Sequence, residues 1–231
     1  MREADKLTPF QTNGVQAFSR QSVHRLRRLM VVLPSIRWSG RASIVGGIVW
    51  VVYSTFEMLR PFGIASTYDP SLGYDRIMDG TIYRLYLGVG NISVVLLSVA
   101  VLGLSRLGRT GGLLRGGRVV GAVSFVMGLV GLVGVVLLAP IPAGLGAMLG
   151  SIILAVGTAL AVGGIWLHSD IQPTTAMIAL AAAGLLIVPL RTLVNALQLL
   201  PASVAVTIMI IWGVCWIITG VQLMRRVVYP L

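Results

Sequence analysis

The sequence has few charged residues. Only 11% of its side chains are charged, whereas a soluble globular domain carries about 25%. The mean hydropathy over the 231 residues is +0.92. This scarcity of charge excludes an ordinary water-soluble domain. It indicates a membrane protein with room for about six crossings of roughly 20 apolar residues each.

Cysteine and histidine are almost absent. Cys215 is the single cysteine, which excludes an intramolecular disulfide and a thiolate metal cluster within one chain. His24 and His168 lie far apart in the sequence and give no metal-ligand spacing. A Ser-His-Asp set, a His-Glu-x-x-His motif and paired carboxylates are also missing. We therefore predict no metal site, no cofactor and no enzymatic activity.

Lysine is as rare as cysteine. Lys6 is the only lysine, and the remaining basic residues are arginines that stand between or outside the apolar runs. This placement is typical of the positive-inside bias of membrane proteins. The formal net charge of +11 therefore does not indicate a nucleic-acid partner. Membrane lipids are the predicted partners, and other membrane subunits or a second copy of the chain are the protein partners to consider.

A short basic segment, Ser105–Arg118, separates two long apolar runs and holds no acidic residue. Its four arginines are Arg106, Arg109, Arg115 and Arg118. Arginine-rich short loops stay on the cytoplasmic side during insertion, and their side chains face the lipid surface. The glycines of Gly108–Gly117 invite a phosphate-binding interpretation, but the Gly-Lys-Ser/Thr ending and the preceding strand are missing. We interpret the segment as a flexible basic turn.

The longest uncharged run covers 49 residues, Val119–Leu167. One helix of that length would far exceed the roughly 30 Å hydrocarbon core. Pro140 and Pro142 break the run, because proline removes a backbone donor and disfavours helix before it. We therefore predict a helical hairpin whose arms are Val119–Ala139 and Leu145–Leu167.

The complete prediction is an all-α integral membrane protein with six transmembrane helices in three hairpins. The six spans are Ile44–Leu59, Tyr83–Leu104, Val119–Ala139, Leu145–Leu167, Thr174–Leu190 and Ala202–Met224. Residues 1–43 form a cytoplasmic N-terminal segment, residues 44–224 the transmembrane domain, and residues 225–231 a cytoplasmic tail. Arg191–Leu200 is predicted as an outer connection or a short interfacial helix.

The distribution of basic residues predicts that both termini are cytoplasmic. Eight basic residues before Ile44, four in the basic segment and two at the tail fall inside, against four outside. The lack of a clear transit peptide favours the plasma membrane. Gly14–Leu33 has the pattern of a basic amphipathic helix on the inner surface, or of a positively charged flank of the first span. Its arginines are Arg20, Arg25, Arg27 and Arg28.

Glycines recur inside the third and fourth spans. Gly128, Gly131 and Gly134 are spaced by three, and Gly146 with Gly150 forms a GxxxG pair. Small residues allow helix backbones to approach closely in lipid, where little hydrophobic force acts between helices. We predict that these faces pack within one chain, with dimerisation as the alternative.

Glu57 is the only carboxylate within an apolar span. An ionisable group there is a candidate ion or proton site. Alternatively, it forms an interfacial ion pair with Arg60, three residues later, or with Arg84 at the start of the next span. The connection between these two spans also holds three aspartates, Asp69, Asp75 and Asp79. They can bind a divalent cation, but their spacing matches no known loop, which favours plain solvation.

Three further side chains are candidates for a pocket or a contact. Trp212 and Trp216 are four residues apart and share one face of the last span. They can line a cofactor or quinone pocket, but packing is the commoner role of such a stripe. Asn91, in the second span, is expected to form an interhelical hydrogen bond.

The sequence thus favours a multi-pass membrane protein without catalytic motifs, acting as an accessory or structural subunit of a membrane complex. The alternative is a small transporter or channel that uses Glu57 as its coupling or selectivity group. A lipid- or quinone-modifying enzyme is a third hypothesis, for which only His168 and Asp170 are available at the inner interface.

Overall fold

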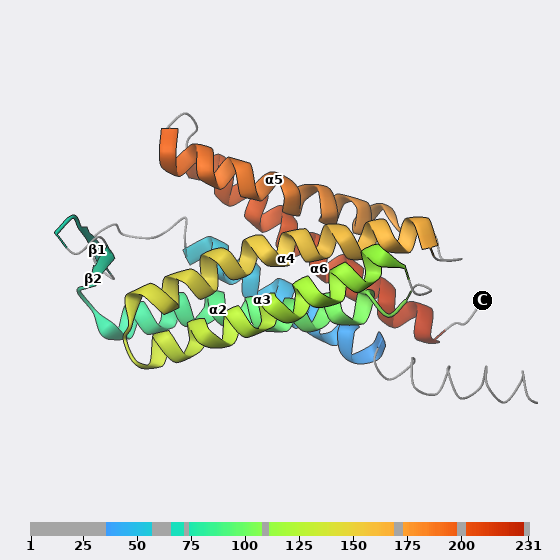
Figure 1. Ribbon diagram of the computed structural model, residues 1–231, viewed down its shortest axis with the longest axis horizontal. Coiled ribbons are helices and arrows are strands. Elements are labelled where there is room, and N and C mark those ends of the chain that lie inside the picture. The colour runs from blue at the N-terminus through green and yellow to red at the C-terminus, as the bar shows by residue number, and fades with distance from the viewer. Residues whose placement is uncertain are drawn as a thin grey trace, which may run out of the picture. The chain divides into compact units, whose positions relative to one another are not determined.

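The computed structural model describes residues 36–56, 66–71, 74–107, 111–168, 173–197 and 202–228. Six helices lie in these residues, as expected where lipid forces each segment to satisfy its own backbone groups (Figure 1). They are the N-terminal helix (residues 36–56), α2 (Gly80–Leu104), α3 (Gly112–Val136), α4 (Pro140–His168), α5 (Thr175–Leu197) and α6 (Ala202–Val228). Predictions for residues 1–35, Glu57, Arg60, Arg109 and Asp170 concern positions outside the described residues.

The helices are paired as three antiparallel hairpins along the chain. In the first, Ser39 of the N-terminal helix donates to the carbonyl of Ala100 near the end of α2, at 2.9 Å. In the second, α3 and α4 lie side by side (Figure 1). In the third, the hydroxyl of Thr174, just before α5, bonds the side chain of Gln222 on α6 at 2.6 Å.

Contacts between the first and last helices connect these hairpins. Ser43 of the N-terminal helix donates to the carbonyl of Trp216 on α6 at 2.6 Å, and Trp50 donates to that of Met209 at 3.0 Å. α4 also contacts both α2 and α5. The N-terminal helix therefore lies between α2 and α6, while α4 joins α2 to α5.

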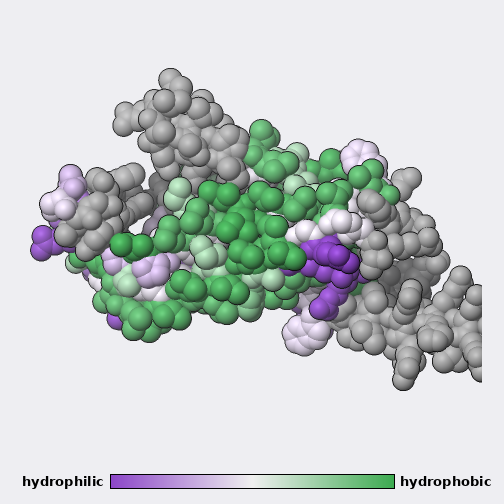
Figure 2. Space-filling model, viewed as in Figure 1, coloured by the Kyte–Doolittle hydropathy of each residue, from purple (hydrophilic) through white to green (hydrophobic). Residues whose placement is uncertain are grey.

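Within the described residues, four helical segments are long and apolar enough to cross a membrane: Gly80–Leu104, Gly112–Val136, Pro140–Leu167 and Val206–Arg225. Thr175–Leu186 is a shorter apolar stretch. Their exposed side chains are mainly aliphatic. Figure 2 shows this apolar surface over α3 and α4. The helical membrane class is thus supported, whereas the six spans and their orientation stay predictions.

The glycine pattern serves contacts within the chain, as predicted. A Cβ atom at Gly146 of α4 would lie 2.8 Å from the backbone nitrogen of Gly131 on α3, which is too close for unbonded atoms. A Cβ at Gly134 would lie 2.9 Å from the Pro142 ring. Only glycine allows α3 and α4 to approach this closely.

Two predicted boundaries are wrong. Pro140 is the first residue of α4 and does not lie in the turn, because a proline at that position loses no helical hydrogen bond. The turn lies before it, where Leu138 has a φ of 54°. The basic segment is likewise not a turn throughout, since α3 begins at Gly112 and places Arg115 and Arg118 on a helix.

The backbone of α5 is helical to Leu197, beyond the end of the predicted span at Leu190. Of the two alternatives for Arg191–Leu200, a connection or a short interfacial helix, the described part to Leu197 is helical and continuous with the span. α6 similarly extends to Val228, beyond the predicted end at Met224. Membrane spans are predicted from apolar content, so they underestimate helices that continue past the hydrocarbon core.

A small β-hairpin, absent from the prediction, precedes α2. Strand β1 (Ser66–Asp69) pairs antiparallel with β2 (Tyr74–Ile77). Asp69 accepts hydrogen bonds from the backbone and hydroxyl of Ser71 at 2.9 and 2.6 Å, as in an Asx-turn. Asp79 caps α2 by accepting from the backbone N–H groups of Thr81 and Ile82. These two aspartates therefore have local structural roles.

The contact between α3 and α4 yields a paired test on one helix. Gly146→Ala should lower the free energy of unfolding by about 1–3 kcal/mol, because the added methyl group overlaps the Gly131 backbone. Gly144→Ala is the matched control, since a Cβ there meets nothing within 4 Å. Maleimide labelling of the buried Cys215 during denaturation in mild detergent measures both. Equal effects of the two substitutions would contradict the proposed contact.

Candidate functional site

The predicted ion site near Glu57 is described only through Arg84. This side chain is exposed at the start of α2, and its Nη2 atom lies 3.4 Å from the carbonyl of Val136. Val136 is the last residue of α3, so the guanidinium contacts the negative end of a helix dipole. Glu57 and Arg60 lie outside the described residues, and their pairing with Arg84 stays a prediction.

Asn91 lies at a crossing of three helices and is fully buried. Its Nδ2 atom donates to the carbonyl of Leu87 at 2.9 Å and to that of Ala143 on α4 at 3.1 Å. The predicted interhelical bond is therefore present. Its Oδ1 atom has no hydrogen-bond partner and faces Gly131 and Gly146, where any Cβ atom would overlap it. The amide thus fits a space that two glycines leave open.

An aromatic cluster fills the centre of the described helices. Trp50 of the N-terminal helix meets Trp212 of α6 edge-on, with ring centroids 4.8 Å apart. Trp212 meets Trp216 at 6.1 Å, and Trp50 meets Tyr53 at 5.6 Å. All four rings are at most 1% exposed. The two tryptophans predicted to line a pocket or contact lie here in the hydrophobic core.

The indole groups also connect helices through hydrogen bonds. Trp50 donates to α6, as described above, and Trp212 donates to the carbonyl of Leu180 on α5 at 3.1 Å. The Nε1 atom of Trp216 and the hydroxyl of Thr219, one turn later, are buried and find no hydrogen-bond partner in the described part of the chain. The cluster therefore joins the N-terminal helix to α6 and α6 to α5.

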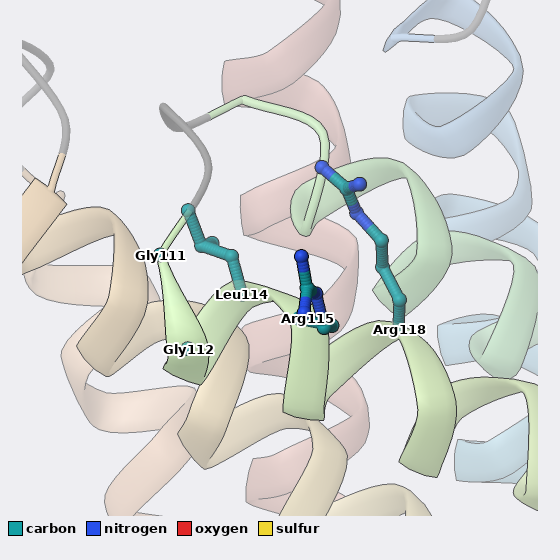
Figure 3. A pocket seen from close by; sticks show the side chains of 5 residues that line it. All are labelled: Gly111, Gly112, Leu114, Arg115 and Arg118. Carbon is teal, nitrogen blue, oxygen red and sulfur yellow. The ribbon is translucent and has the colours of Figure 1, made fainter.

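A cavity lies at the start of α3. It has a volume of about 320 Å³ and is lined by Gly111, Gly112, Leu114, Arg115 and Arg118 (Figure 3). That volume is at the lower end of the roughly 300–1,000 Å³ of small-molecule pockets. Arg115 and Arg118 are three residues apart, which places them on one side of the helix.

The two arginines of this cavity differ in their protein contacts. Arg118 is half-buried, and its Nε and Nη2 atoms donate to the carbonyl of Ser105 at 3.2 and 2.9 Å. Ser105 is the C-cap of α2, so Arg118 stabilises the negative end of that helix. Arg115 is exposed, and its guanidinium has no hydrogen-bonding or ionic partner among the described residues.

The charged side chains that line the cavity are both positive. Gly111 caps α3 without a side-chain hydrogen bond, and the first turn holds no acidic residue. The positive end of the helix dipole is therefore combined with two like charges, an unfavourable arrangement that an anion would relieve. Arg106, also exposed, follows the end of α2 nearby. The described residues include no group of three His, Cys, Asp or Glu side chains able to hold a metal ion.

The cavity was missed at the level of sequence because Arg115 and Arg118 were assigned to a turn. The signal in the sequence is the spacing of three between Arg115 and Arg118, together with the spacing of four between Gly117 and Gly121. Both spacings are typical of a helix. A Cβ at Gly117 would lie 3.1 Å from the Ala161 backbone, which shows that α3 already packs on α4 at this level.

Comparisons with known protein families, curated proteins and solved structures find no match for this chain. Its apolar helices are compatible with a multi-pass membrane protein. Any more specific function must therefore be argued from the residues themselves.

The aromatic cluster can be tested by removing one indole donor. Trp212→Phe should lower the free energy of unfolding by about 2 kcal/mol, because both a buried hydrogen bond and ring contacts are lost. Trp38→Phe is the control, since Trp38 is 65% exposed and its loss should cost less than about 0.5 kcal/mol. Thermal unfolding followed by circular dichroism measures both. A Trp212→Phe protein as stable as the control variant would refute the role of the cluster.

Proposed function

We propose that this protein is a non-enzymatic accessory or structural subunit of a larger membrane complex. The observation that carries this proposal is the filled interior, in which Trp50, Trp212 and Trp216 are fully buried and contact one another. Interlocked rings give a rigid support whose outer faces remain available to lipid and to neighbouring subunits.

The use of the buried polar side chains supports the same proposal. Ser39, Ser43 and Ser93 donate to helix carbonyls, and Asn91 does the same. A substrate pathway needs polar groups that face a water-filled space. Here these groups serve contacts between helices, which is the role expected in a structural subunit.

We further propose that the protein lies in the plasma membrane with both termini cytoplasmic. The antiparallel pairing brings the end of α2, the start of α3 and the end of α6 to one end of the helices. Seven arginines of the described residues gather there: Arg37, Arg41, Arg106, Arg115, Arg118, Arg225 and Arg226. Three lie toward the opposite end, together with Asp69 and Asp79: Arg76, Arg84 and Arg191. This asymmetry agrees with the positive-inside rule.

The proposal predicts a stoichiometric foreign partner. The protein should be extracted from its own membrane in mild detergent, its native mass measured, and every co-purifying chain identified. We expect a mass well above 24.5 kDa and at least one partner at fixed ratio that is absent from a mock purification. A lone monomer or homo-oligomer would overturn the accessory role.

In that event a small transporter or channel becomes the leading function. Glu57→Gln in proteoliposomes, with proton flux followed by a pH-sensitive dye, separates the two roles. A structural subunit should show no flux that depends on Glu57, whereas a transporter should lose at least tenfold, because the group that carries the proton is gone. Asp69→Asn is the control, since the Asp69 carboxylate accepts hydrogen bonds from Ser71 in the turn between β1 and β2, outside the helices.

A further inference from the structure

We propose that the cavity at the start of α3 binds the anionic phosphate headgroup of a membrane phospholipid, with an acyl chain along the adjoining valines of α3. The proposal combines the two guanidinium groups of the cavity with an apolar stripe that continues from it. It depends on the membrane location of the helices and not on the accessory role.

The cavity supplies donors suited to a phosphate. The guanidinium of Arg115 is exposed and has no partner among the described residues. Arg118 is held in place by the Ser105 carbonyl through Nε and Nη2, which leaves its Nη1 donors available. Guanidinium groups form strong, directed hydrogen bonds with phosphate oxygens. The first backbone N–H groups of α3 add to the positive potential.

No described acidic side chain neutralises this site. Asp79 caps the opposite end of α2, about 37 Å away at 1.5 Å per residue. Asp69 and Asp75 lie before Asp79, in the β-hairpin at that same opposite end. The repulsion between Arg115, Arg118 and the helix dipole is therefore compensated by an external anion, and phosphate on a lipid is the anion present at a membrane surface.

The stripe beside the cavity identifies the source of the phosphate. Val119, Val126 and Val133 follow Arg115 at near-helical spacing and are 59%, 55% and 58% exposed. They extend over about 21 Å, which exceeds half of the roughly 30 Å hydrocarbon core. Figure 2 shows the apolar surface of this face and hydrophilic residues over the first turns of α3. An amphiphile with a charged head and an apolar tail matches both parts.

Native mass spectrometry of the full-length protein in mild detergent tests the proposal. The probes are palmitoyl-oleoyl-phosphatidylglycerol, its phosphatidylcholine counterpart and free glycerol phosphate. We expect one phosphatidylglycerol retained per chain, with an affinity at least tenfold above that for phosphatidylcholine, whose choline cation offsets the phosphate charge. Free glycerol phosphate should bind at least tenfold more weakly, because it lacks the chain that lies on the valine stripe.

The double variant Arg115→Gln/Arg118→Gln should lose this preference by at least tenfold. The matched control, Arg225→Gln/Arg226→Gln, removes the same charge at the end of α6 and should retain it. Equal losses in both double variants would show general surface attraction and overturn the site. Equal binding of glycerol phosphate would assign it to a soluble anion and overturn the lipid.

The single variant Arg115→Gln separates an effect on lipid binding from an effect on folding. Arg115→Gln leaves the Arg118–Ser105 contact intact, so its helix content should equal that of the natural protein. We expect it to lower phosphatidylglycerol affinity severalfold by itself, and Arg115→Lys to restore part of the loss. Unchanged lipid affinity in a folded Arg115→Gln protein would refute the proposal.

Discussion

Close approach of helix backbones at glycine is the constraint on which the rest of the structure depends. At Gly131 and Gly146, α3 and α4 approach too closely for any other residue. The N-terminal helix and α6 approach similarly at Gly47 and Gly213. Lipid provides little hydrophobic force between helices, so dispersion contacts and hydrogen bonds must hold them together. Short backbone separations make both available, because serine hydroxyls can then reach the carbonyls of a neighbouring helix.

The interior of the helices holds aromatic rings, whereas the charged side chains lie toward the helix ends. Aromatic rings occupy the volume that small residues leave at the centre, and Trp50 and Trp212 direct their N–H groups to carbonyls of other helices. Charge is confined to the helix ends, with most described arginines at one end. Two of these arginines, Arg115 and Arg118, line a cavity beside the apolar surface. Their guanidinium groups can recognise an anionic ligand there.

Much of this fold follows from the sequence, because long apolar runs in lipid must be helical. The hairpin pairing, the contacts of Gly131 and the hydrogen bond of Asn91 were predictable for that reason. Pro140 marked the break, but proline both ends and begins helices, so the start of α4 was misplaced. The Arg115–Arg118 cavity was missed although the spacing of the two arginines is compatible with a helix, because glycine and arginine suit a loop and a helix start equally. The buried face of each helix could not be predicted either, because buried and lipid-facing residues are equally apolar.

The contact between the N-terminal helix and α6 has a consequence for biogenesis. The hydrogen bond of Ser43 spans a sequence separation of 173 positions, and that of Trp50 spans 159 positions. At about 5–20 residues per second, synthesis of the intervening chain takes roughly 10–30 s. During that interval the N-terminal helix lacks its contacts with α6, and the indole of Trp50 has no carbonyl from α6 to bond. The order of translation therefore makes α6 the helix that completes the assembly. A nascent chain stalled before α6 leaves the Ser43 hydroxyl and the Trp50 indole without their hydrogen-bond partners.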